Sequence, residues 1–119
     1  MPYDVLPGRR LPPTEQLLLD GGDARIALDA TGMANKYGCA PLPDPGLLAF
    51  GSSTASSISA AGFSAADCLR ENLHRAADVE PPAVTYTREL ERIRQTLLRL
   101  CGVANLPGLD TVFAASGTD

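Results

Sequence analysis

The sequence is poor in several residue types on which common folds and sites depend. Its 119 residues include no tryptophan, one lysine, one histidine and three cysteines. The cysteines are odd in number and far apart, at Cys39, Cys68 and Cys101, and no C-x-x-C pair is present. A structural zinc site needs about four clustered Cys or His ligands, so this composition disfavours a metal centre.

Positive charge and long hydrophobic runs are also scarce. Fourteen acidic residues outnumber ten basic ones, and the net charge of −4 disfavours a nucleic-acid binder, which would be basic. No apolar stretch approaches the ~20 residues that span a bilayer, and the N-terminus lacks the apolar core of a secretory signal. The composition, 45% hydrophobic and 20% charged, is that of a globular domain. We therefore expect a cytoplasmic protein with free thiols.

The first half shows little regular structure. Prolines interrupt the N-terminal arm, although TEQLLLD at 14–20 predicts one or two helical turns behind a Thr cap. ARIALD at 24–29 alternates weakly and predicts a short strand, and the Gly/Pro-rich segment 30–46 predicts a loop. The small residues that follow, within 47–63, suit either a flexible linker or a close-packed turn that faces a polar ligand.

Two amphipathic helices are predicted in the second half. SAADCLRENLHRAA at 64–77 opens with an S-x-x-D capping box. In TRELERIRQTLLRLCG at 87–102, Thr87 is placed to cap the start and Gly102 to adopt the left-handed position after the end. The charges on one side of this helix predict a solvated face. The apolar face consists of Leu90, Ile93, Leu97, Leu100 and Cys101.

The C-terminal residues predict a strand followed by a turn. TVFAAS at 111–116 is a short apolar run, typical of a strand buried on both faces, and it leads into Ser116, Gly117 and Thr118. Such a turn is either a phosphate site at a helix N-terminus or a plain helix cap. The order helix, loop, strand, turn predicts an α/β fold. Because one buried strand and one weak strand cannot form a parallel sheet, we expect an incomplete domain, as a fragment or a split subunit.

The stretch TRELERIRQTLLRLCGVANLPGLDTVFAASGTD resembles the start of the large domain in fold-type I pyridoxal-5′-phosphate-dependent enzymes. These form the aminotransferase superfamily, and the resemblance is to its class V and cysteine-desulfurase branch. It implies a transferase-like α/β cofactor-binding domain that begins within 64–119, preceded by an N-terminal arm and loops at 1–63. It implies that Ser116, Gly117 and Thr118 bind the cofactor phosphate. The residues implied to contact substrate or a neighbouring subunit are Asn35, Tyr37, Ser53 and Thr54.

The function implied is part of a pyridoxal-phosphate enzyme that acts on an amino acid. In the family the Schiff-base lysine lies downstream of the turn, so we expect a second polypeptide that carries the rest of the domain, in an oligomer. Lys36, the only lysine, precedes the turn, and the turn is one residue shorter than the family's. The alternative is a non-catalytic interaction protein that docks through helix 87–101. A nucleotide-binding domain ranks last, because both glycine-rich phosphate motifs are missing.

Overall fold

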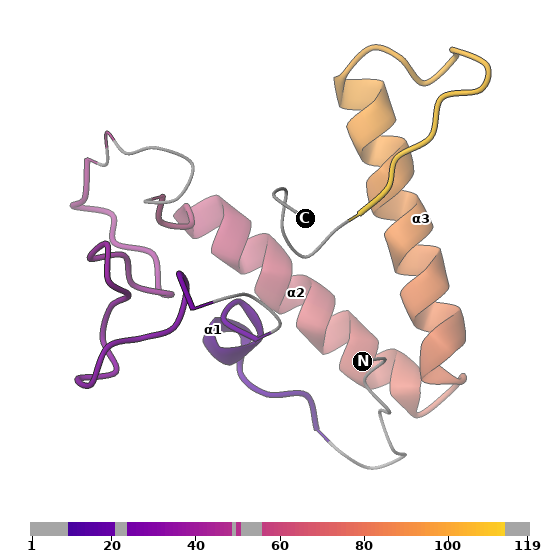
Figure 1. Ribbon diagram of the computed structural model, residues 1–119. Coiled ribbons are helices and arrows are strands. Elements are labelled where there is room, and N and C mark those ends of the chain that lie inside the picture. Colours follow the sequence, from indigo (N-terminus) through magenta and orange to yellow (C-terminus); the bar gives the residue numbers. More distant parts are fainter. Residues whose placement is uncertain (1–9, 21–23, 49, 51–55, 114–119) are drawn as a thin grey trace. The chain divides into compact units, whose positions relative to one another are not determined.

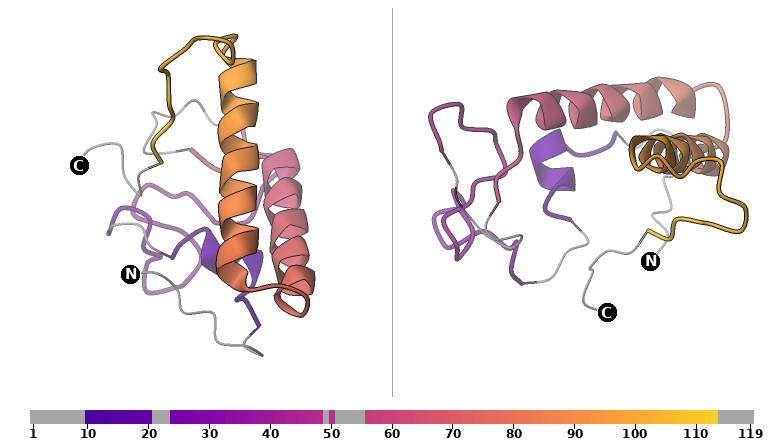
Figure 2. Two further views of the ribbon diagram at one scale, coloured as in Figure 1. Left: turned by 90° about the vertical axis from the view of Figure 1, so that its right-hand side faces the viewer. Right: turned by 90° about the horizontal axis from the view of Figure 1, so that it is seen from above.

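The protein is a chain of helices joined by turns and loops. The computed structural model describes residues 10–20, 24–48, 50 and 56–113. It contains α1 (Thr14–Leu17), α2 (Ala60–Ala77) and α3 (Pro82–Leu100) (Figure 1). Two further views show helices and connecting segments without a sheet among the described residues (Figure 2). The prediction of an α/β, fold-type I domain is therefore wrong.

Both predicted strands fail for the same physical reason. A strand needs a neighbour that pairs its backbone groups, and a short apolar run does not reveal whether one exists. Segment 24–29 contributes only Leu28, which forms an isolated antiparallel bridge with Asn35. In the described part of 111–116, the Thr111 carbonyl accepts a hydrogen bond from the Arg94 guanidinium instead, at 3.0 Å. Residues 114–116 lie outside the described residues.

The described residues form two compact units, 11–71 and 72–113, the second of which also includes Arg10, and the boundary between them falls within α2. In the first unit a buried hydroxyl attaches α1 to α2. Thr14 is 3% exposed, and its Oγ1 donates a hydrogen bond to Asp67 Oδ1 at 2.5 Å. Arg70 Nε donates to the same Thr14 oxygen at 3.2 Å. The Thr14 hydroxyl and then Arg70 lower the pKa of Asp67 below its ordinary value of 3.8.

The position of Thr14 corrects one detail of the sequence prediction. The single helical turn is present, but Pro13 occupies the N-cap and Thr14 is the first helical residue. The Thr14 side chain therefore does not cap its own helix. It reaches Asp67, which lies 53 residues further along the chain, and this contact satisfies a hydroxyl that would otherwise be buried without a partner.

Between α1 and α2, polar side chains hold the backbone of the loop. Asp29 accepts hydrogen bonds from the Thr31 amide at 2.9 Å and from the Thr31 hydroxyl at 2.6 Å. These bonds, the hydroxyl bond above all, lower the pKa of Asp29. Asp44 accepts from the Gly46 amide at 2.9 Å in the same manner. Each carboxylate stabilises a tight turn of the kind that Asp and Asn favour.

The second helix begins four residues earlier than predicted. α2 starts at Ala60, because the Ser59 Oγ accepts a hydrogen bond from the Gly62 amide at 3.0 Å, in the geometry of an N-cap. Ser64, the predicted cap, lies inside the helix. The capping box is therefore wrong, and its acidic member, Asp67, contacts α1 instead.

In the second unit, α3 also begins earlier than predicted. Its first residue is Pro82, where proline suits the first helical turn, rather than a residue near Thr87. The turn from α2 is fastened by Glu80, which accepts a hydrogen bond from the buried Thr85 hydroxyl at 2.6 Å. Arg88 donates to the same carboxylate at 2.7 Å. Arg88 and then Thr85 lower the pKa of Glu80, and the ion pair raises the pKa of Arg88.

The end of α3 confirms the prediction for Gly102. Gly102 has φ +70°, and its amide donates to the Arg99 carbonyl at 3.0 Å. The Val103 amide donates to the Leu98 carbonyl, also at 3.0 Å. These two bonds form a Schellman motif, which satisfies the last carbonyls of a helix and turns the chain away from its axis.

After this turn the chain runs back along α3, as Figures 1 and 2 show. Arg94 holds the returning segment through three contacts. Its Nε donates to the Thr111 carbonyl and lies 3.3 Å from Asp110 Oδ1. Its guanidinium also lies 5.6 Å from the centre of the Phe113 ring, in a cation–π contact.

Neither unit has a conventional hydrophobic core. No hydrophobic side chain is buried among the described residues, and the two buried residues are Thr14 and Thr85. Burial of apolar surface is normally the main favourable term in folding. Because little apolar surface is buried here, helix capping, side-chain hydrogen bonds and ion pairs are major determinants of this structure. Apolar surface is also left available for contact with a partner.

Candidate functional site

Most of the predicted site residues lie outside the described residues. These are Ser116, Gly117 and Thr118 of the predicted phosphate turn, and Ser53 and Thr54 of the predicted substrate wall. Their roles in binding cofactor and substrate stay predictions.

Asn35 and Tyr37 are described and lie in one turn. The Asn35 Oδ1 accepts hydrogen bonds from the amides of Tyr37 and Cys39, both at 3.0 Å. The backbone amide of Asn35 donates a hydrogen bond to the backbone carbonyl of Cys39 at 2.9 Å. Asn35 therefore shapes the loop itself. Tyr37 is 43% exposed, and the Lys36 Nζ lies 5.1 Å from the centre of its ring.

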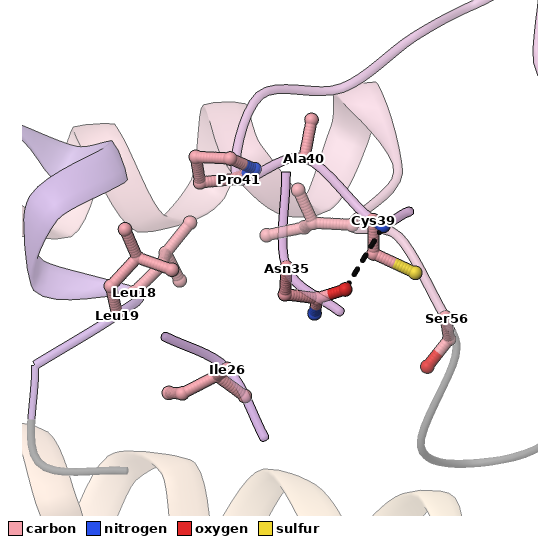
Figure 3. Close-up of a pocket in the computed structure, with 9 residues that line it drawn as sticks. Leu18, Leu19, Ile26, Asn35, Cys39, Ala40, Pro41 and Ser56 are labelled. Carbon is pink, nitrogen blue, oxygen red and sulfur yellow. Dashed lines mark hydrogen bonds between the residues drawn. The ribbon is translucent and has the colours of Figure 1, made fainter. Parts of the chain in front are cut away.

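A small pocket lies in the unit 11–71, beside Asn35 (Figure 3). Its volume is about 170 Å³, below the ~300 Å³ at which typical small-molecule sites begin. Its lining is mainly aliphatic, and its polar side chains are those of Asn35, Cys39 and Ser56. The other lining residues are Leu18, Leu19, Ile26, Ala40, Pro41 and Ile58.

The lining of this pocket limits its chemistry. None of these nine residues carries a charge, so the pocket offers neither an acid–base pair nor a cation for a phosphate or carboxylate. The side-chain oxygen of Asn35, Oδ1, already accepts hydrogen bonds from two backbone amides. The pocket suits one aliphatic side chain better than a polar substrate.

The carboxylates with lowered pKa values lie outside the pocket lining. They are Asp29, Asp67, Glu80 and Glu91, and hydrogen bonds within the chain cause each shift. For Glu91 the donors are Gln95 and then Arg94. Perturbed carboxylates often mark active sites, but these fasten turns and helices. Among the described residues no group of three Cys, His, Asp or Glu is placed to hold a metal ion.

The second candidate surface is the α3 apolar face, defined as Leu90, Ile93, Leu97 and Leu100. Leu90 and Ile93 are half-buried, whereas Leu97 is 40% and Leu100 is 79% exposed. Exposure of this face therefore increases toward the C-terminal end of α3. Tyr86, in the first part of the helix, is 62% exposed.

The polar side of α3 largely neutralises itself. Arg92 Nε lies 2.7 Å from Glu89, and Arg94 pairs with Glu91, each three residues apart. Such pairs leave no concentrated charge for an anionic ligand. This agrees with the predicted solvated face, and it leaves the apolar face as the distinctive surface of the helix.

Sequence reasoning missed the extension of this surface to Tyr86, because it began the helix at Thr87. The available signal is Pro82, because proline is favoured in the first turn of a helix. It also missed the link from Thr14 to Asp67, for which no local pattern exists.

Comparisons of the chain with protein-family models, with curated proteins and with solved structures find no match. No helix in the described part of the chain has the length and apolar character needed to cross a membrane. Functional inference therefore rests on the two surfaces described above.

Proposed function

We propose that this chain is a non-catalytic interaction protein that docks on a partner through the α3 apolar face. The observation that carries this proposal is the exposure of Leu97 and Leu100, 40% and 79%, on a 19-residue amphipathic helix. A helix in a protein that stands alone normally buries such a face against its own core. Helix-face docking is a common recognition mode, read out by apolar residues at three- and four-residue spacing.

A pair of matched variants tests this proposal. Leu97→Asp places a charge within the apolar face, whereas Gln95→Asp places the same charge on the polar side of the same helix. The unchanged chain and the two variants serve as three separate baits in pull-downs from lysates of the cells that produce this protein. The proposal expects a protein that binds the unchanged chain and the Gln95→Asp chain but not the Leu97→Asp chain. Equal recovery by all three baits contradicts it.

The cofactor hypothesis is a separate proposal. In it Ser116, Gly117 and Thr118 bind the phosphate of pyridoxal 5′-phosphate, and a second polypeptide supplies the Schiff-base lysine for an amino acid substrate. A complex with that polypeptide should bind the cofactor, and Gly117→Pro should abolish binding because it blocks close approach of the backbone. Unchanged cofactor absorbance in the Gly117→Pro complex contradicts this role.

We further propose a reducing, cytoplasmic location. Cys39, Cys68 and Cys101 are all described, and all are free thiols. Free thiols persist in the cytosol, where glutathione and thioredoxin keep them reduced. Thiol labelling of the protein in intact cells, followed by cell fractionation, tests this, and disulfide-linked protein in an oxidising fraction contradicts it.

A further inference from the structure

We propose that the partner seated on the α3 apolar face is α3 of a second copy of this chain, in parallel orientation. This inference rests on the docking role proposed above and names the partner. It is drawn from the spacing of apolar residues along α3 and from the charges that flank them.

Five apolar residues of α3 follow a heptad pattern, whereas Val84 and Leu98 lie outside it. Tyr86, Leu90, Ile93, Leu97 and Leu100 are spaced by four, three, four and three residues. This alternation keeps one seam on one side of a helix, and it is the spacing at which two helices pack knobs into holes. Leu90 and Leu97 occupy one set of core positions, and the other three residues occupy the second set. Three of the five are more than a third exposed in the single chain.

The flanking charges select the orientation. Glu89 immediately precedes the seam residue Leu90, and Arg94 immediately follows the seam residue Ile93. In a parallel pair of helices these two flanking positions meet across the interface, so Glu89 of each copy lies beside Arg94 of the other. An antiparallel pair loses this attraction, because each flanking position then meets the equivalent position of the other copy and Glu89 no longer faces Arg94.

The single chain leaves about a quarter of each charged side chain exposed for these contacts. Glu89 pairs with Arg92 and is 23% exposed, and Arg94 pairs with Glu91 and is 25% exposed. Arg94 also donates from Nε to the Thr111 carbonyl and lies beside Asp110 and the Phe113 ring, so these contacts and the Glu91 pair use two of its three nitrogens. A guanidinium has five N–H donors and a carboxylate accepts about four hydrogen bonds, so the third nitrogen can donate to Glu89 of a second copy. The dimer thus adds contacts without requiring that the pairs within the chain break.

The first experiment measures self-association of the full chain by sedimentation equilibrium, from about 1 μM to about 1 mM. Glu89→Arg and Arg94→Glu should each weaken the dimer roughly tenfold, because each places like charges beside each other. Mixing the two variants should restore the dimer, since one chain then presents two arginines to two glutamates of the other. Circular dichroism of each variant checks that α3 remains helical. Restoration on mixing separates an intermolecular pair from damage to the helix within one chain.

A crosslinking experiment tests the parallel register. The background variant replaces Cys39, Cys68 and Cys101 by serine. Leu100→Cys in this background should form a disulfide between two copies when diamide is added, because a parallel pair brings these core positions within bonding range. The matched control, Gln95→Cys, lies away from the seam, so its two copies should associate without forming a disulfide. Equal crosslinking of the two variants overturns the parallel arrangement.

The outcomes separate failure of this inference from failure of the proposed function. Suppose that the chain is monomeric at every concentration and that a different protein binds the unchanged chain and Gln95→Asp but not Leu97→Asp. This outcome contradicts the dimer and supports docking through the α3 apolar face. If the chain dimerises and Leu97→Asp leaves that dimer intact, the dimer does not form through the α3 apolar face and this inference is wrong. If the chain is monomeric and the pull-down recovers the same proteins with Leu97→Asp as with Gln95→Asp, both the dimer and the docking function are wrong.

Discussion

The two units of the molecule use one polar arrangement over very different lengths of chain. In each, a buried threonine hydroxyl donates to a carboxylate that also pairs with an arginine. The unit 11–71 joins Thr14 to Asp67 across 53 residues, whereas the unit 72–113 joins Thr85 to Glu80 across five. Loop-closure scaling makes the longer link about 2 kcal/mol more costly in chain entropy.

This difference teaches which part of the chain organises itself. In the unit 72–113 the fastening contacts of α3 are local, and the most distant partner named above, Phe113, is 19 residues from Arg94. Local contacts form fast and do not depend on a core. The attachment of α1 includes two long-range hydrogen bonds of Thr14, to Asp67 and from Arg70, in a unit whose described residues bury no hydrophobic side chain. We therefore expect α1 to detach before α3 unravels.

The largest test of this comparison is acidification. The folded pKa values of Asp67 and Glu80 lie below their ordinary values of 3.8 and 4.5, so the folded chain binds fewer protons than the unfolded chain. The stability they contribute is complete above those ordinary values and is lost as pH falls through the folded pKa. Below about pH 4 we expect α1 to detach, while helix hydrogen bonds and the Gly102 motif keep α3 helical.

Amide exchange measured residue by residue from neutral pH to about pH 2 follows this loss. The control is Asp67→Asn, in which the attachment of α1 should be weak at every pH and should lose its acid dependence. Equal acid sensitivity of α1 and α3 would show that the two units do not differ as described.

Removal of each threonine hydroxyl is the next largest test. Thr14→Val keeps the shape of the side chain but leaves Asp67 without its main donor, so residues 14–20 should lose amide protection on the order of tenfold. Thr85→Val is the matched change in the other unit. It should raise the pKa of Glu80 yet leave α3 protected beyond its first turn, because Arg88 remains on that carboxylate. Comparable loss of protection in both units contradicts the comparison.

The smallest effect is expected at the end of α3. Gly102→Ala forces a side chain into a left-handed conformation and should lower the free energy of unfolding of the unit 72–113 by about 1 kcal/mol. Gly102→Asn should cost less, because asparagine tolerates that conformation. Thermal unfolding followed by circular dichroism provides the measurement. Because no other residue lies within 4 Å of an added Cβ, a much larger loss would contradict a purely conformational cause.

The sequence predicted the helices better than their boundaries. Amphipathic spacing located α2 and α3, and Gly102 ended α3 where expected. Both starts were placed too late. For α2, the small residues before Ser64 concealed Ser59 as the cap, and for α3, Pro82 both follows one helix and begins the next. Local patterns identify that a helix exists more surely than where it starts.

The strands and the long-range link could not be predicted in the same way. The apolar run at 111–113 has no intrinsic feature that distinguishes a paired strand from a segment held by Arg94. The link from Thr14 to Asp67 depends on two helices meeting, which one sequence does not encode locally. Of the predicted site residues, Asn35 lines the pocket, but its side-chain oxygen accepts hydrogen bonds from the loop's own backbone amides.

The self-contained loop around Asn35 has an evolutionary consequence. One side chain and its own backbone hold the turn through Cys39, and Gly38 adopts φ +77°. The Lys36 and Tyr37 side chains at the tip make none of these hydrogen bonds. Related chains should diverge freely at these two positions while retaining asparagine at 35 and glycine at 38, so the tip is a site where new specificity can arise without loss of structure.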